Sequence, residues 1–173
     1  MINKGKGGGN TITGLNFEKE RDILHILSKA KGYSVKENVI YFQGKEVARS
    51  YRKQSLYRYL SAKGVHWSKY ISKRLYPDEA IYVIVNNTLF IIEMKFQKVS
   101  GSVDEKLQTC DFKRKQYLRL MSPLNVEVEY IYILNDWFKK SEYKDTLDYI
   151  ISVHCHYYFN YLPLQKLGLP VPR

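Results

Sequence analysis

The 173 residues, 45% of them hydrophobic and 26% charged, have the composition of a single globular domain, which excludes intrinsically disordered and fibrous proteins. The apolar runs are far shorter than the ~20 residues of a membrane span, no signal-peptide pattern stands at the N-terminus, and two cysteines cannot form a disulfide framework, so we expect a cytoplasmic protein without membrane contact. Lys and Arg number 28 against 17 Asp and Glu, and the net charge of +11 indicates a polyanionic partner such as nucleic acid.

The N-terminal part of the chain predicts a tail, a helix and two strands. Residues 1–13 are rich in glycine and are expected to form a flexible tail. Apolar residues at helical spacing predict a helix over Asn16–Lys31. Strands are predicted over Asn38–Phe42 and Lys45–Ser50, because both runs are rich in strand-forming residues and a glycine lies between them.

Residues 45–76 form a basic segment, predicted to be an insertion with two short helices. It holds nine basic residues and one acidic residue, Glu46, and tyrosines and tryptophan are interleaved with the cations. Such cations can meet phosphates while the rings pack against sugars or bases. We expect it to bind DNA through Arg52, Lys53, Arg58, Lys63, Lys69 and Lys73. The alternative is a pair of amphipathic helices whose basic face is simply solvated.

The C-terminal part predicts a hairpin followed by alternating helices and strands. Two β-branched and aromatic runs, Ile81–Val85 and Thr88–Phe96, flank Asn86-Asn87, and asparagines tolerate the positive φ of a tight turn. A capping box at Ser102 and Glu105 predicts a helix that ends near Met121. The remaining elements are a strand, a helix and an edge strand, over Asn125–Leu134, Tyr143–Ser152 and Tyr157–Phe159. Within one domain of residues 1–173, this order predicts an α/β fold with a mixed central β-sheet flanked by helices.

Four acidic-x-lysine triplets occur in the chain: Glu93–Lys95, Asp104–Lys106, Asp111–Lys113 and Glu142–Lys144. The last three lie in polar helical or loop sequence, where residues two apart do not face each other and a solvated surface explains them. The first triplet ends an otherwise apolar strand, in which residues two apart point to the same side. Glu93 and Lys95 are therefore expected to face one way together.

The hairpin register brings a second carboxylate to this pair. If Asn86-Asn87 is a two-residue turn, Ala80 lies opposite Glu93 and Asp78 lies opposite Lys95. Two neighbouring carboxylates repel, and hard oxygen ligands suit Mg²⁺. The alternative is a structural ion pair between Asp78 and Lys95 while Glu93 faces water, and the spacing alone leaves both readings open. The side chains that share the patch are Asp78, Glu93, Lys95 and Gln97.

The run of Pro77-Asp78, a hairpin and then Glu93-Met94-Lys95, placed directly after a basic segment, resembles the PD-(D/E)xK nuclease superfamily. The stretch Gly101–Lys106 after the second strand looks like that of small type II restriction endonucleases. The order helix, three strands, helix, strand over Leu15–Leu134 is similar to the common core of this superfamily. The resemblance therefore implies a restriction-endonuclease-like core in the order α-β-β-β-α-β.

The resemblance also implies roles for single residues. Asp78 and Glu93 would ligate Mg²⁺, with the Met94 carbonyl as a further ligand. Lys95 would orient or help to deprotonate the attacking water. Some members add an acidic residue from the first helix, and Glu18 matches that position. Gln97 extends the motif in a way similar to recombination nucleases and junction resolvases, and we expect it to contact DNA.

The function that follows is a Mg²⁺-dependent type II restriction endonuclease, which hydrolyses phosphodiester bonds of double-stranded DNA at a specific sequence. A palindromic site cut on both strands favours a homodimer, and no small-molecule cofactor is expected. Two alternatives remain open. The protein could be a structure-selective nuclease of the junction-resolvase or repair type, or a non-catalytic DNA-binding subunit with a structural carboxylate cluster.

Overall fold

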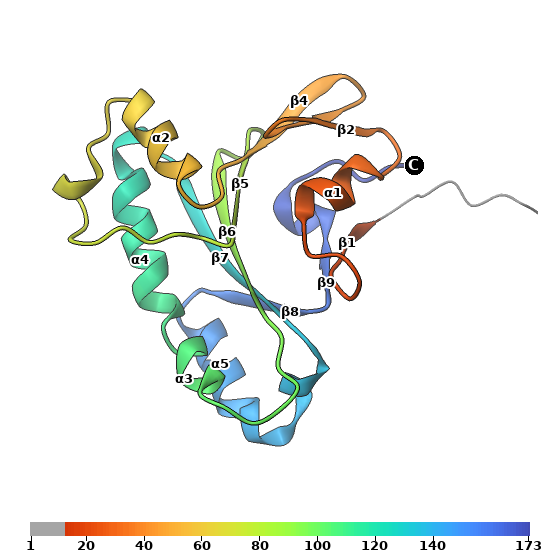
Figure 1. The fold of residues 1–173 in the computed structure, drawn as a ribbon, viewed down its shortest axis with the longest axis vertical. Coiled ribbons are helices and arrows are strands. Elements are labelled where there is room, and N and C mark those ends of the chain that lie inside the picture. The colour runs from red at the N-terminus through yellow and green to blue at the C-terminus, as the bar shows by residue number, and fades with distance from the viewer. Residues whose placement is uncertain (1–12) are drawn as a thin grey trace, which may run out of the picture.

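The computed structural model describes residues 13–173, so the predicted flexible tail, residues 1–13, lies outside the described residues except for Thr13. A seven-stranded sheet in the order β2-β3-β4-β5-β6-β7-β8 runs through the molecule (Figure 1). Its strands are β2 (Tyr33–Lys36), β3 (Val39–Phe42), β4 (Lys45–Ser50), β5 (Glu79–Val83), β6 (Thr88–Lys95), β7 (Glu127–Leu134) and β8 (His156–Phe159). Each pair of neighbouring strands from β2 to β6 is antiparallel. The pairs β6–β7 and β7–β8 are parallel. The predicted α/β fold with a mixed central sheet is confirmed.

Helices cover both faces of the sheet. The helices are α1 (Ile23–Ser28), α2 (Ser55–Ala62), α3 (Val103–Leu107), α4 (Cys110–Met121) and α5 (Lys144–Ser152). One core lies between α2, α3, α4, α5 and the sheet face that carries Ala80 and Ile91. The other lies between α1 and the face that carries Ile81 and Ile92. In Figure 1, α4 and α1 accordingly lie on opposite sides of β5 and β6.

The hairpin of β5 and β6 is confirmed, but its predicted register is wrong by two residues. Ala80 pairs with Ile91 rather than with Glu93, because the connection is a four-residue loop, Ile84–Asn87, rather than a two-residue turn. Asn87 adopts a φ of 50°, and its N–H donates to the Ile84 carbonyl. Since side chains alternate along a strand, a slip of two residues keeps each side chain on its predicted face.

The N-terminal helix is much shorter than the predicted Asn16–Lys31. Gly14–Asn16 forms strand β1, which pairs with β9 (Tyr161–Pro163) in a separate two-stranded sheet. The Asn16 side chain accepts a hydrogen bond from the N–H of Glu18, which holds the chain in a turn. The helix begins after Asp22, whose carboxylate caps it by accepting from the N–H groups of Leu24 and His25.

Most other predicted elements are present with shifted ends. Strands β3 and β4 match, and β8 is the edge strand predicted near the C-terminus. The basic segment holds α2 and a 3₁₀ turn over Trp67–Lys69, in place of two short helices. The single helix predicted up to Met121 is divided into α3 and α4, and Ser102 makes no side-chain capping bond, so the predicted capping box is wrong. Strands β2 and β9 have no counterpart in the prediction.

Candidate active site

The carboxylate of Glu93 lies near the end of β6, on the face that α4 covers, and is held between two lysines. The Glu93 side chain is 8% exposed. Its Oε2 lies 3.1 Å from Nζ of Lys95 on the same strand. Nζ of Lys113, one helical turn into α4, lies 3.0 Å from Oε1 and 3.2 Å from Oε2. Both carboxylate oxygens therefore have an ammonium partner.

These neighbours keep Glu93 ionised although it is buried. Burial alone raises the pKa of a carboxyl group because a low-dielectric surrounding disfavours the charged form. The Tyr130 hydroxyl of β7, together with Lys95 and Lys113, more than offsets this effect and holds the pKa of Glu93 below its ordinary value. The site thus presents a buried negative charge that is held by Lys95 of β6 and Lys113 of α4.

Asp78 lies immediately before β5 and is exposed. Glu79 pairs with Ile92, so continuing this register by one residue sets Asp78 across from Glu93, rather than across from Lys95 as predicted. Burial raises the pKa of Tyr117 of α4, and the charges of Tyr57, Glu93 and Asp78 raise it further. The two carboxylates therefore share one face of the hairpin. The alternative Asp78–Lys95 ion pair is absent from the ion pairs of the described residues, in which Lys95 pairs with Glu93.

The sequence interpretation missed the contribution of α4. It assigned the Asp111–Lys113 triplet to a solvated surface, whereas Lys113 reaches Glu93 across the helix–sheet interface. Tyr117, four residues later on α4, is buried on the same side of the helix. The signal in the sequence is this spacing of four, which places a cation and a buried tyrosine on one helix face.

The other predicted ligands lie in different surroundings. Glu18 is exposed in the turn before α1, and its neighbours Phe17 and Ile23 belong to the core of the opposite sheet face, so the structure does not bring Glu18 to Asp78 and Glu93. Met94 occupies the β6 position that pairs with Ile133 of β7.

Gln97 follows β6 and is bound to the end of the neighbouring strand. Its N–H donates to the side chain of Asn135, and its carbonyl accepts from the same amide at 2.7 Å. The Gln97 side chain donates to the Val99 carbonyl. Gln97 therefore ties the strand end that follows Glu93 and Lys95 to the end of β7.

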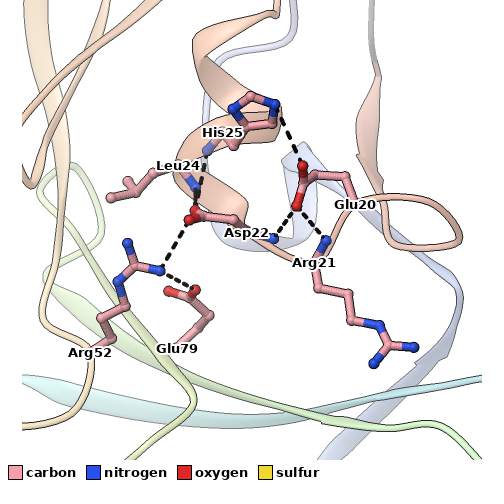
Figure 2. A network of polar contacts seen from close by, with 7 residues as sticks. All are labelled: Glu20, Arg21, Asp22, Leu24, His25, Arg52 and Glu79. Atoms are coloured by element: carbon pink, nitrogen blue, oxygen red, sulfur yellow. Dashed lines mark hydrogen bonds and ion pairs between the residues drawn. The ribbon is translucent and has the colours of Figure 1, made fainter.

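A second buried carboxylate lies directly beside Asp78 but on the opposite sheet face. Arg52 donates to Oε1 of Glu79 at 3.2 Å and to Oδ2 of Asp22 at 3.3 Å, and Figure 2 shows this network at the start of α1. Burial raises the pKa of Glu79 to about 7 against the lowering effect of Arg52. Arg52, predicted to contact DNA, is thus engaged with carboxylates and fixes the start of β5.

The basic segment lies over the same sheet face as Glu93. Leu56, Tyr57 and Leu60 of α2 are buried in the core that also holds Tyr117. The Tyr57 hydroxyl accepts from the N–H of Leu75 and donates to the Leu75 carbonyl, which ties the chain before Asp78 to α2. The remaining cations predicted to contact DNA are all exposed: Lys53, Arg58, Lys63, Lys69 and Lys73. Figure 1 shows α2 and α4 on the same side of the sheet.

The carboxylates of Asp78 and Glu93 are the possible Mg²⁺ ligands on this sheet face. Within residues 13–173, no group of three or more His, Cys, Asp and Glu side chains gathers closely enough to hold a metal ion. Mg²⁺, however, is commonly held by one or two protein carboxylates, with water and substrate phosphate completing its six ligands. An ionised, buried Glu93 and an exposed Asp78 on the same face meet that requirement. Asp78 and Glu93 therefore offer carboxylates of the kind that Mg²⁺ takes as ligands, while both oxygens of Glu93 are already paired with ammonium groups.

Comparisons with protein-family models, with curated proteins and with solved structures found no match. Among residues 13–173, none of the helices combines the length and the apolar character needed to cross a bilayer. The function of this chain is therefore inferred from its own chemistry and geometry.

Proposed function

We propose that the protein is a Mg²⁺-dependent endonuclease that hydrolyses phosphodiester bonds of double-stranded DNA at a specific sequence, as type II restriction endonucleases do. The observation that carries the proposal is the buried, ionised Glu93, with Asp78 on the same hairpin face and Lys95 at 3.1 Å. Burying an ionised carboxylate costs free energy that ammonium partners offset, and metal binding is one function for which such a group is retained.

The order of elements supports the same proposal. Helix α1, strands β4, β5 and β6, helix α4 and strand β7 occur in this order along the chain with other elements between them, and β6 and β7 are parallel. This is the order of the PD-(D/E)xK core that the sequence resembles. The chain also has β2 and β3 between α1 and β4, α2 between β4 and β5, and α3 between β6 and α4.

Asp78 and Glu93 would hold the metal, and Lys95 would then act beside it. When bound, Mg²⁺ lowers the pKa of its water and offsets charge on the phosphate oxygens. Lys95, whose side chain is 22% exposed, positions that water and adds a second positive charge beside the phosphate. The burial of Glu93 keeps its carboxylate in one orientation during the reaction.

The exposed cations of the basic segment supply the binding energy for DNA. Helix α2, which carries Arg58 and is followed by Lys63, packs on the sheet face that carries Glu93, and we propose that a duplex held by these cations reaches the site. Cutting both strands of a palindromic sequence requires two such sites, and we propose a homodimer on that ground. Size-exclusion chromatography with light scattering on DNA-bound protein would give twice the monomer mass plus the mass of one duplex if this is right.

The test is digestion of plasmid DNA with Mg²⁺ or with a chelator. Discrete fragments that need Mg²⁺ are expected from the wild type. Asp78→Ala, Glu93→Ala and Lys95→Ala should each lower the cleavage rate by at least about a hundredfold while DNA binding persists. Asp145→Ala, at an exposed position of α5, is the matched control and should cut like the wild type. Wild-type cleavage retained in all three site variants would refute the assignment.

Both carboxylate oxygens of Glu93 are paired with lysines, and this observation favours one other function, that of a non-catalytic DNA-binding subunit. Two lysines already neutralise this carboxylate, as they would in a purely structural ion cluster. DNA binding without turnover in any divalent metal, unchanged in Glu93→Ala, would identify that role. Preferential cutting of four-way junctions over linear duplex would instead identify a structure-selective nuclease.

A further inference from the structure

The second lysine at Glu93 comes from a different element than the first. Lys95 lies on β6 beside Glu93, whereas Lys113 extends from α4 and spans both carboxylate oxygens, at 3.0 and 3.2 Å. The Lys113 side chain is 27% exposed, so its ammonium group lies at the edge of the core with solvent on one side. A lysine has a flexible four-carbon stem, and an ammonium group in this place can leave the carboxylate without unfolding α4.

We propose that Lys113 is a movable counter-charge of the site: it occupies Glu93 while no metal is bound and turns to the phosphate group of the DNA when a divalent metal takes the carboxylate. The proposal rests on the proposed function above and assigns a role to a residue outside the PD-(D/E)xK pattern. It makes Lys113 a competitor of the metal in the absence of DNA and a partner of the metal in its presence.

The charges of the site support this exchange. Asp78 and Glu93 are balanced by Lys95 and Lys113, so these four side chains together carry no net charge before a metal binds. A divalent cation raises their sum to two positive charges. A phosphodiester brings one negative charge and gains more toward the transition state, so the loaded site matches the charge that develops there. A metal that entered without displacing an ammonium group would meet a cation about 3 Å from its ligand oxygens, which is strongly unfavourable.

Helix α4 offers a matched control for Lys113. Lys115 lies on the same helix two residues later, has a side chain that is 64% exposed, and pairs with Asp111 on the helix surface rather than with the site. Replacing either lysine by methionine removes the same charge from the same helix. Only the variant at position 113 changes what Glu93 contacts.

The experiment measures Mn²⁺ binding without DNA, from the electron paramagnetic resonance signal of the free aqua ion. Lys113→Met should bind Mn²⁺ about tenfold more tightly than the wild type, because a competing cation is gone. Lys113→Arg, which keeps the charge, and Lys115→Met should stay within about threefold of the wild type. At saturating metal, single-turnover DNA cleavage by Lys113→Met should be slower by about a hundredfold. Tighter metal binding with slower chemistry is a pattern that a merely structural lysine does not produce.

The outcomes separate this inference from the proposed function. Mn²⁺ binding by Lys113→Met that equals or is weaker than that of the wild type overturns the role of Lys113, provided that Glu93→Gln abolishes binding. An equal gain in affinity in Lys115→Met also overturns it, since the effect is then one of net charge. Absence of Mn²⁺ binding in both the wild type and Lys113→Met overturns this inference, whereas the proposed function is decided by the Mg²⁺-dependent digestion of plasmid DNA. If Lys113→Met does not fold, Lys113→Gln is measured in its place and interpreted in the same way.

Discussion

Two buried glutamates near one end of the central hairpin have opposite electrostatic surroundings. Glu93 faces α4 and is held ionised by a hydroxyl and two ammonium groups. Glu79 faces α1, and burial raises its pKa to about 7 even though Arg52 donates to it. One of its oxygens, Oε2, has no hydrogen-bond partner among the described residues. The exposed Asp78 immediately precedes Glu79 in sequence, so the contact between Arg52 and Glu79 holds the backbone next to Asp78.

The raised pKa of Glu79 predicts how stability depends on pH. Because the folded protein binds this proton more tightly than the unfolded chain, the free energy of unfolding falls as pH rises from about 4.5, the ordinary value, to about 7. Glu79→Gln removes this contribution. The stability of the variant relative to the wild type should therefore increase by roughly 3 kcal/mol between pH 4.5 and pH 8.

Urea unfolding of both proteins across this pH range measures the difference directly. Glu127→Gln, at an exposed position at the start of β7, controls for the loss of one negative charge. Parallel stability curves for the wild type and Glu79→Gln would contradict the burial argument.

The hairpin shows how far local sequence can specify an element. β-Branched and aromatic runs around Asn86-Asn87 located β5 and β6 to within a few residues, because strand preference and turn chemistry are local properties. The length of the loop between β5 and β6 is not evident from the local sequence, so the predicted register of the hairpin was wrong by two residues. The shared face of Asp78 and Glu93 could still be predicted, since only an odd shift moves a side chain to the other face.

Elements that depend on distant partners could not be predicted. Gly14–Asn16 is a strand because Tyr161–Pro163 pairs with it, and no local pattern reveals a partner so far along the chain. Asp22, six residues after the end of the strand, caps the helix that begins at Ile23. Lys113 was missed for the same reason: its partner Glu93 lies on another element, and only the packing of α4 on β6 and β7 brings them together.

The left-handed conformation of Asn87 gives a prediction at the scale of the hairpin. At a φ of 50°, glycine is unstrained because it has no β-carbon, and Asn and Asp are tolerated, whereas other residues are strained. Asn87→Ala and Asn87→Gly both lose the side-chain bonds to Tyr82 and Asn125. The alanine variant should be less stable than the glycine variant by about 1 kcal/mol. Thermal or urea unfolding that ranks alanine as equal or more stable would contradict this account of the turn.

At the scale of the whole molecule, helix α2 of the basic segment packs on the sheet face that α4 covers. The exposed cations of the basic segment lie over the sheet face that α4 covers, where Glu93 and its lysines also lie. Helix α1 and its exposed Lys29 lie on the opposite face. This asymmetry predicts that DNA approaches from the side of α2 and α4.

Salt dependence of DNA binding tests that orientation. About six phosphate contacts would reduce affinity roughly a thousandfold between ~50 and ~200 mM salt. The double variant Arg58→Ala/Lys63→Ala, both exposed in or next to α2, should lower the slope of log affinity against log salt by nearly two. Lys19→Ala/Lys29→Ala, both exposed beside α1, is the control and should leave the slope unchanged. Equal effects of both double variants would contradict a one-sided DNA surface.

Whether Asp78, Glu93 and Lys95 cut DNA is tested most directly by sequencing the new ends formed when genomic DNA is incubated with the purified protein and Mg²⁺. The account predicts ends that recur at one short sequence, carry 5′-phosphates and disappear with chelator or in Glu93→Ala. An end profile that matches the protein-free sample in every divalent metal, or that persists in Glu93→Ala, would contradict it.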